Sequence, residues 1–365
     1  MSKRVIISGG GTGGHIYPAI AIASALQQKH PDLEVLFVGA LGKMEMEKVP
    51  RAGYNIIGLP IVGIKRELSV SNLAFPFKLV DSLLKAKKVI RDFKPDVAVG
   101  VGGFASGPLL MMASLAGIPT LIQEQNSYAG ITNKLLSRKA STICVAYPGM
   151  ESFFSKEKIR LLGNPVRSDI VNVSSKRKEA LLHFKLNEGM KTLFVMGGSL
   201  GARSINESIN AGLNQLVDAG YQILWQTGKT YIDTAQATIA GLGTGLVKAF
   251  DFIYTMDLAY AIADVVVSRA GALSVSELCL AAKPSILVPY PAASEDHQTK
   301  NALTLVEQDA AILIKDSKAK QELVPAALEL LNDIAKQEDL KINIRKLARP
   351  TAAEDIAEEV LKLIR

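Results

Sequence analysis

Cysteine is scarce in this chain: only two of its 365 residues are Cys, at positions 144 and 279. Both lie in apolar runs, STICVAY around Cys144 and ELCLAA around Cys279. Such surroundings are typical of small buried side chains, which favours free thiols in a reducing compartment over a disulfide. The start of the chain lacks the pattern of a signal peptide, because Lys3 and Arg4 lead directly into a short strand-like segment, and we expect no secretion signal.

An uncharged run over residues 97–122 is long enough to cross a membrane. Glycines and prolines interrupt it and divide it into strand, loop, helix and strand, so we expect no membrane span. Hydrophobic residues make up 48% of the chain and charged residues 21%, as in folded globular proteins. A length of 365 residues exceeds one ordinary core and predicts two domains.

The net charge of +7 is distributed unevenly. Residues 1–163 contain 20 Lys and Arg against 11 Asp and Glu, a balance of +9, whereas residues 164–365 contain 22 against 24, a balance of −2. A basic first half favours an anionic partner such as a phosphorylated substrate, an acidic lipid or a nucleic acid. The alternative is an ordinary solvated basic surface.

Short β-rich runs alternate with helical patterns, which predicts an α/β protein with doubly wound parallel sheets. In the first half we expect strands over residues 5–8, 34–39, 54–59, 96–101, 120–124 and 142–147, and helices over 16–28, 79–93, 107–117 and 130–139. The second half restarts this plan at KTLFVMGGSLGAR and continues with strands over residues 221–227, 246–250, 264–268, 284–290 and 310–315. Two such halves indicate two Rossmann-like domains.

Glycine and proline in GNPVR, residues 163–167, break the pattern and suggest the domain join. We therefore expect domains over residues 1–163 and 164–350. A final helix over residues 351–365 could pack back on the first domain, and Thr351 with Glu354 predicts a capping box at its start.

Three glycine-rich loops each follow a predicted strand and precede a predicted helix: GGGTGGH at 9–15, GVGGFASG at 100–107 and GGSLGAR at 197–203. Glycine lets backbone N–H groups approach an anion, and a helix start adds partial positive charge. Tight packing of strand on helix also requires glycine, but three loops together favour phosphate-bearing ligands.

Gly9, Gly11 and Gly14 satisfy the dinucleotide pattern G-x-G-x-x-G, yet the acid that should bind the ribose is missing. The second strand ends on Gly39-Ala40, without an acidic residue. No G-x-x-x-x-G-K-[ST] occurs, and no D-x-D suggests a metal ligand pair. The sequence therefore disfavours a redox cofactor, a nucleoside triphosphatase loop and a metal site.

Two segments of the second half offer groups for a nucleotide sugar. SRAGALSVSELCLAA, residues 268–282, begins a helix after a strand and presents Ser274, Ser276 and Glu277. Glu277 could accept two ribose hydroxyls, or could simply complement the helix dipole in the first turn. PYPAASEDHQTKNA, residues 289–302, presents His297, Gln298 and Asn301 after the next strand.

Taken in order, these motifs resemble the MurG-type glycosyltransferases. The resembling stretches are GGGTGGHIYPAIAIA, GVGGFASGP, QEQNSYAGITNK, GNPVR, GGSLGAR, SRAGALSVSE and DHQTKNA, from residue 5 to about 302. The resemblance implies the GT-B arrangement of two Rossmann-like domains with the active site in the cleft between them, and no cofactor. It implies transfer of N-acetylglucosamine from UDP-N-acetylglucosamine to undecaprenyl-pyrophosphoryl-N-acetylmuramyl-pentapeptide.

The resemblance also implies site residues, position by position. Those expected to bind UDP-N-acetylglucosamine are Thr12, Gly13, Gly14, Asn126, Arg167, Ser199, Ile253, Ala272, Leu273, Ser274, Val275, Ser276, Glu277 and Gln298. Gly102, Gly103 and Ser106 are expected at the acceptor pyrophosphate. Inverting transfer needs a base for the acceptor hydroxyl, for which we predict His15, with Glu124 as the other candidate. Arg167 and helix starts would stabilise the departing diphosphate without a metal.

A lipid acceptor implies work at the cytoplasmic face of the inner membrane, as a peripheral protein. Over residues 69–94 we predict membrane contact for Leu73, Phe75, Phe77 and Leu79, beside basic residues that suit anionic headgroups. We expect Leu83, Leu84, Val89 and Ile90 to pack on the sheet instead.

Three other functions stay open at this point. A related glycosyltransferase could use another lipid acceptor such as diacylglycerol. A redox enzyme is disfavoured by the missing ribose acid, and a nucleic-acid module by the lack of aromatic and basic alternation, so we expect no nucleic-acid partner.

Overall fold

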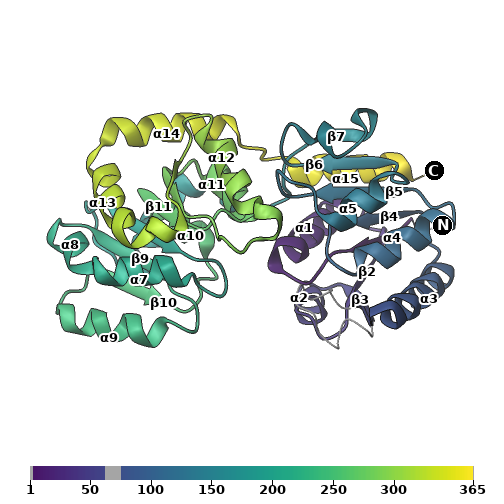
Figure 1. The fold of residues 1–365 in the computed structure, drawn as a ribbon, viewed down its shortest axis with the longest axis horizontal. Helices are drawn as coiled ribbons and strands as arrows, with labels where there is room; N and C mark the ends of the chain where they lie inside the picture. Colours follow the sequence, from purple (N-terminus) through teal and green to yellow (C-terminus); the bar gives the residue numbers. More distant parts are fainter. Residues whose placement is uncertain (1–2, 62–74, 365) are drawn as a thin grey trace. The chain divides into compact units, whose positions relative to one another are not determined.

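The computed structural model describes residues 3–61 and 75–364, and the chain divides into two compact units. Unit 1 contains residues 1–167 and 351–365, and unit 2 contains residues 168–350. The division falls four residues after the join suggested by the sequence, at the end of GNPVR. Figure 1 shows that each unit contains a sheet covered by helices.

Unit 1 contains a seven-stranded sheet in the order β3-β2-β1-β4-β5-β6-β7, in which the neighbouring strands pair in parallel. Its strands are β1 (Arg4–Ser8), β2 (Glu34–Ala40), β3 (Asn55–Leu59), β4 (Val97–Gly100), β5 (Thr120–Glu124), β6 (Thr142–Val145) and β7 (Ile159–Leu161). Its helices are α1 (Gly13–Lys29), α2 (Glu45–Arg51), α3 (Phe75–Phe93), α4 (Ser106–Leu115), α5 (Ile131–Ser137) and α15 (Ala352–Leu363). The six predicted strands are confirmed, and the uncharged run 97–122 forms β4, α4 and β5.

Alternate strand residues face opposite sides of this sheet, because side chains alternate along a strand. Val5 and Ile7 of β1 pack with α1 and α15, whereas Ile6 packs with α3 and α4. The final helix α15 thus completes the core of unit 1, with Ile356 and Val360 fully buried. Its predicted capping box is wrong: the Thr351 hydroxyl donates to the Asp355 carboxylate at 2.8 Å, and Thr351 makes no side-chain cap.

Three residues of α3 lie on the side of the helix opposite to the one predicted from the sequence. Phe75 and Leu79, expected at the membrane, are partly buried against the core of unit 1. Leu84, expected on the sheet, has a relative exposure of 63%. Val89 and Ile90 are buried as predicted and Phe77 is exposed, while Leu73 lies outside the described residues. In the described part of the chain, no helix is long and apolar enough to span a membrane.

Unit 2 contains a six-stranded sheet in the order β10-β9-β8-β11-β12-β13, again with parallel pairs. Its strands are β8 (Thr192–Met196), β9 (Gln222–Gln226), β10 (Val247–Phe250), β11 (Val265–Ser268), β12 (Ser285–Leu287) and β13 (Ile312–Leu313). Its helices are α6 (Arg177–Phe184), α7 (Arg203–Ala211), α8 (Leu213–Asp218), α9 (Ile232–Leu242), α10 (Met256–Ile262), α11 (Ala272–Ala281), α12 (His297–Val306), α13 (Ala319–Asn332) and α14 (Ile334–Lys346).

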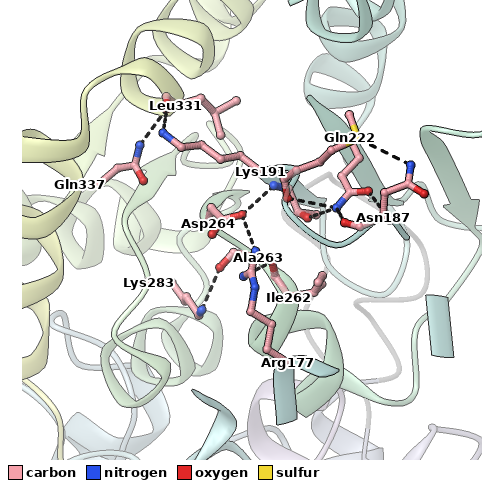
Figure 2. A network of polar contacts seen from close by, with 12 residues as sticks. Arg177, Asn187, Lys191, Gln222, Ile262, Ala263, Asp264, Lys283, Leu331 and Gln337 are labelled. Atoms are coloured by element: carbon pink, nitrogen blue, oxygen red, sulfur yellow. Dashed lines mark hydrogen bonds and ion pairs between the residues drawn. The ribbon is translucent and has the colours of Figure 1, made fainter. Parts of the chain in front are cut away.

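A polar network fixes the amino ends of β8 and β11 in unit 2 (Figure 2). The Asp264 carboxylate accepts hydrogen bonds from the Thr192 backbone N–H at 2.7 Å and from Arg177 at 3.2 Å. Lys283 donates to the carbonyl of Ala263 at 2.8 Å. Burial lowers the pKa of Lys283 to about 8. This network lies at the end of the sheet opposite to the glycine loop, and it leaves the carboxyl ends of the strands for the site.

Candidate active site

The first glycine loop connects β1 to α1 and presents a histidine beside a threonine. Thr12 is the N-cap residue of α1, with extended backbone and no side-chain cap. Its Oγ1 lies 3.1 Å from Nδ1 of His15 instead. The Thr12 side chain therefore contacts the imidazole and can fix its orientation and tautomer.

The second glycine loop packs directly against the first. Gly102 and Gly103 have φ of +92° and +86°, which only glycine adopts readily. A Cβ atom at Gly103 would overlap the carbonyl oxygen of Gly10, and one at Gly102 would lie 2.9 Å from Nε2 of His15. The structure thus brings His15, Gly102 and Gly103 together at the carboxyl ends of β1 and β4, where ligands bind in such sheets.

Ser106 does not fit its predicted contact with the acceptor pyrophosphate. It is fully buried at the start of α4, and its hydroxyl lies within hydrogen-bond distance of two backbone carbonyls, Ser8 at 2.9 Å and Gly102 at 2.8 Å. The hydroxyl therefore joins the second loop to the end of β1. The prediction is corrected to a structural role for this side chain.

Glu124 is likewise a poor candidate for the base. Its side chain is buried at the end of β5, and Oε1 accepts from the Asn126 backbone N–H at 3.1 Å. Oε2 accepts from the Gly130 N–H at 2.9 Å and from Asn133 Nδ2 at 2.8 Å. These bonds occupy the carboxylate and shape the segment that leads to α5, on which the half-buried Asn126 lies.

In unit 2, the loop after β8 carries Ser199 at an exposed position before α7 begins at Arg203. Gln226, at the end of β9, connects this loop to the next segment: its Nε2 donates to the Gly198 carbonyl at 3.1 Å, and its Oε1 accepts from the Ile253 N–H at 2.9 Å. The Ile253 side chain is buried, and its backbone N–H is held by Gln226, so its predicted contact with uracil stays a prediction. Gln226 was not predicted from the sequence.

Helix α11 begins at Ala272 after Gly271, and its first turn presents backbone N–H groups at the end of β11. Leu273, Ser274 and Ser276 are half-buried, Ala272 and Val275 are buried, and the Ser276 hydroxyl donates to the Ala272 carbonyl at 3.0 Å. Glu277 lies in the second turn, so a role for it as a first-turn acid is wrong. Its Oε2 accepts from the fully buried Tyr260 hydroxyl at 3.0 Å.

A buried arginine connects the remaining loops of unit 2. Arg269, which follows β11, donates from Nη1 to the Val288 carbonyl at 3.0 Å and forms an ion pair with Asp316 at 2.5 Å. Its Nη2 donates to Ser204 at the start of α7, at 3.1 Å. Gln298, on α12, accepts from the Tyr290 N–H at 2.9 Å. The segments that follow β8, β11 and β12 are therefore connected to one another through the guanidinium group of Arg269.

Most of the predicted residues follow the carboxyl ends of neighbouring strands within each unit. In unit 1 these residues are Thr12, Gly13, Gly14, His15, Gly102 and Gly103; in unit 2 they are Ser199, Ala272–Glu277 and Gln298. Arg167 is the exposed last residue of the first segment of unit 1. Arg269 and Tyr260 were not predicted. The position of Arg269, a charged residue directly after an apolar strand, could have drawn attention to it, whereas Tyr260 has no such signal.

Comparison with known proteins agrees with this arrangement. Residues 5–145 match the family model described as glycosyltransferase family 28 N-terminal domain, and residues 192–360 match the family 28 C-terminal domain. A Cytophaga hutchinsonii protein named UDP-N-acetylglucosamine–N-acetylmuramyl-(pentapeptide) pyrophosphoryl-undecaprenol N-acetylglucosamine transferase is 57% identical, covering 99% of this chain and 97% of that protein. A Phocaeicola vulgatus protein of the same name is 55% identical, covering 99% and 96%.

The fold agrees as well. The crystal structure of Acinetobacter baumannii MurG superposes with a TM-score of 0.82 at 30% identity, covering 99% of both chains. The family models cover both units and the relatives extend over nearly the full length. The chain therefore belongs to glycosyltransferase family 28, as one of its MurG-type members.

Proposed function

We propose that this chain transfers N-acetylglucosamine from UDP-N-acetylglucosamine to the 4-hydroxyl of undecaprenyl-pyrophosphoryl-N-acetylmuramyl-pentapeptide. The observation that supports this most strongly is 57% identity over nearly the full length to a transferase named for that reaction. The Ser199 loop and the start of α11 supply the backbone donors that a diphosphate needs.

In this proposal unit 2 binds the nucleotide. The backbone N–H groups at the start of α11 and the Ser199 loop hold the diphosphate, with Arg167 as a cationic partner. Glu277, whose carboxylate Tyr260 orients, accepts the ribose hydroxyls. The segment at Ile253 meets uracil, and Gln298 and Asn126 bind the sugar.

Unit 1 supplies the acceptor side. His15 acts as the general base if its Nδ1 carries the proton and donates to Thr12 Oγ1, which leaves Nε2 to accept a proton. The acceptor oxygen then forms a bond to the anomeric carbon as the bond from that carbon to UDP breaks. The hydroxyl proton passes to Nε2, and the configuration inverts to give a β-1,4 linkage. Gly102 and Gly103 provide backbone near the acceptor pyrophosphate.

A surface of α3 and α4 supports contact with a lipid membrane; it keeps the predicted Phe77 and leaves out the partly buried Phe75 and Leu79. Phe77, Val80 and Leu84 form one exposed stripe on α3, with relative exposures of 79%, 56% and 63%. Met111 and Leu115 are exposed on α4, which packs beside α3. Exposed basic residues Lys78, Lys87, Lys88 and Arg91 accompany the stripe and suit anionic headgroups at the cytoplasmic face of the membrane.

The test is release of UDP from matched pairs of donor and acceptor. We expect release with UDP-N-acetylglucosamine and a short-chain analogue of the polyprenyl acceptor. We expect at least about tenfold less with UDP-glucose, because the groups that bind the acetamido group are then unpaired. Diacylglycerol in place of the acceptor should give no acceptor-dependent release. Equal or greater release with diacylglycerol would contradict the proposed acceptor.

A further inference from the structure

A buried carboxylate lies beneath the first glycine loop, outside every motif singled out in the sequence. Glu45, the first residue of α2, has no exposed surface. Its Oε2 accepts from the Gly11 backbone N–H at 2.9 Å, and its Oε1 accepts from the Ala40 N–H at 3.0 Å. A buried carboxylate is costly unless it is hydrogen-bonded, so these two bonds account for its place.

The glycines around Glu45 leave space for this side chain. A Cβ atom at Gly10 would overlap Oε1 of Glu45, and a Cβ atom at Gly39 would lie 2.6 Å from its Cγ. Neither glycine has a φ in the left-handed region, so conformation does not require glycine there. Contact with Glu45 therefore requires glycine at both positions.

We propose that Glu45 is the resident anion of the first glycine loop. In a dinucleotide-binding fold, the N–H groups of this loop hold the pyrophosphate of the cofactor. Here the Gly11 N–H donates to the protein's own carboxylate, two residues before α1 begins at Gly13. Helix α1 has no acidic residue in its first turn, so Glu45 supplies the negative charge near its positive end.

This assignment explains why a loop with the spacing G-x-G-x-x-G is not a dinucleotide site. The acid expected at the end of the second strand is absent, but an acid five residues beyond Ala40 turns back under the loop. A second anion at the same N–H group would be repelled by the carboxylate and would find its donor occupied. The loop is held in one conformation without a ligand.

Glu45 is on this account a positioning residue for His15, and this role rests on the proposed function. Gly10 contacts the second glycine loop at Gly103, and His15 lies against Gly102. Displacement of Gly10 and Gly11 would therefore move the imidazole relative to both loops. Misplacement of a reacting group by about 1 Å can lower the rate about 100-fold.

The experiment compares Glu45→Gln and Glu45→Ala with Glu47→Gln as the matched control. Glu47 lies on the same helix, with a side chain that is 56% exposed and paired with Arg51 at 2.9 Å. We expect Glu45→Gln to stay folded and to lower kcat about tenfold or more, with less than about threefold change in KM for UDP-N-acetylglucosamine. Glu47→Gln should change neither.

Formate provides the second arm, because it can enter the space left in Glu45→Ala and accept from the same two N–H groups. We expect formate to restore kcat saturably, whereas chloride at equal ionic strength should not. Hydrogen exchange of the Gly11 and Ala40 amides should become faster in Glu45→Ala and slow again with formate.

Two results would overturn the proposal: a folded Glu45→Gln variant with kcat within about twofold of wild type, or a Glu45→Ala variant that formate does not restore. If the wild-type chain transfers no sugar at all, the proposed function fails, and the amide exchange measurements still decide whether Glu45 holds the loop. The failures of the two proposals are therefore distinguishable.

Discussion

At the scale of single residues, neighbouring groups distinguish side chains that the sequence left equivalent. His15 and Glu124 were both candidate bases, and both lie near the carboxyl ends of strands in unit 1. His15 pairs with Thr12 at the junction of two loops, whereas the Glu124 carboxylate accepts hydrogen bonds from Asn126, Gly130 and Asn133. These contacts favour His15 as the base, because the bonds of the Glu124 carboxylate hold the segment that leads to α5.

Replacement of His15 tests this assignment. We expect His15→Ala to lower kcat about 10²- to 10⁴-fold with little change in donor affinity, since the imidazole acts on the acceptor proton. Measurement of kcat and of UDP-N-acetylglucosamine binding separates the two effects. His30→Ala, at an exposed position after α1, should behave as wild type. Equal turnover in His15→Ala and wild type would remove His15 from the role of base.

Lys283 predicts a pH dependence of stability in unit 2. Burial lowers its pKa from 10.5 to about 8, so between these values the unfolded chain binds a proton that the folded chain does not. The contribution of Lys283 to the free energy of unfolding therefore rises above pH 8 and is lost as pH falls through the folded pKa.

We compare urea unfolding of wild type and Lys283→Met at pH 7 and pH 10. The variant avoids the burial of an ammonium group, so its stability relative to wild type should be on the order of 1–3 kcal/mol higher at pH 7 than at pH 10. Lys320→Met, at an exposed position, should show no such change. If the free energy of unfolding differed between Lys283→Met and wild type by the same amount at both pH values, this would contradict the lowered pKa of Lys283.

At the scale of helices and strands, the sequence predicted nearly all strands of the two sheets but left several elements unplaced, among them the helices α9, α13 and α14 of unit 2. Apolar runs identified the strands of both sheets because these strands are buried on both faces. β7 was missed because Arg160 and Leu161 are exposed, and α2 because it has only seven residues and contains Pro50. The orientation of α3 could not be predicted, since Phe75 and Phe77 are equivalent until the helix is docked on the sheet. The pairing of Arg269 with Asp316 joins residues 47 positions apart and has no local signal.

The ion pair of Arg269 and Asp316 should stabilise the segments that follow β8, β11 and β12 in unit 2. Asp316→Ala leaves a largely buried guanidinium without its carboxylate, so we expect the free energy of unfolding to fall by about 2–4 kcal/mol and KM for the donor to rise. Glu322→Ala removes an exposed i,i+4 pair with Lys318 and should cost less than about 1 kcal/mol. Similar stability of the two variants, measured by urea unfolding, would show that the buried pair does not stabilise these segments.

The exposed stripe of α3 should bind lipid. We expect the double variant Phe77→Ser and Leu84→Ser to lower affinity for vesicles containing phosphatidylglycerol about tenfold or more, because each side chain loses apolar contact. Co-sedimentation with vesicles measures this. Leu182→Ser removes a leucine that is 81% exposed on unit 2 and should have no effect. Unchanged sedimentation of the double variant would contradict membrane contact through this stripe.

At the scale of the whole molecule, most of the correct prediction came from the repeated alternation of strands and helices in the two halves of the sequence. The two halves of alternating strands and helices form two parallel sheets, and the strand order around β8 in unit 2 matches the order around β1 in unit 1. The resemblance to MurG-type glycosyltransferases is confirmed by relatives at 55–57% identity. The sequence offered the packing of α15 on unit 1 only as a possibility, because the residues of α1 that α15 contacts are more than 300 positions earlier in the chain. Glu45 could not be predicted either, because its contact with the first glycine loop depends on how the chain turns after β2.

We propose that residues of both units act on one donor and one acceptor in an inverting transfer. The most direct test of this proposal is to identify the product formed from UDP-N-acetylglucosamine and a short-chain acceptor by mass spectrometry and NMR. We expect a single disaccharide with a β-1,4 linkage, and we expect His15→Ala in unit 1 and Glu277→Ala in unit 2 to lower its yield strongly. An α-linked product, or loss of UDP without a disaccharide, would contradict it.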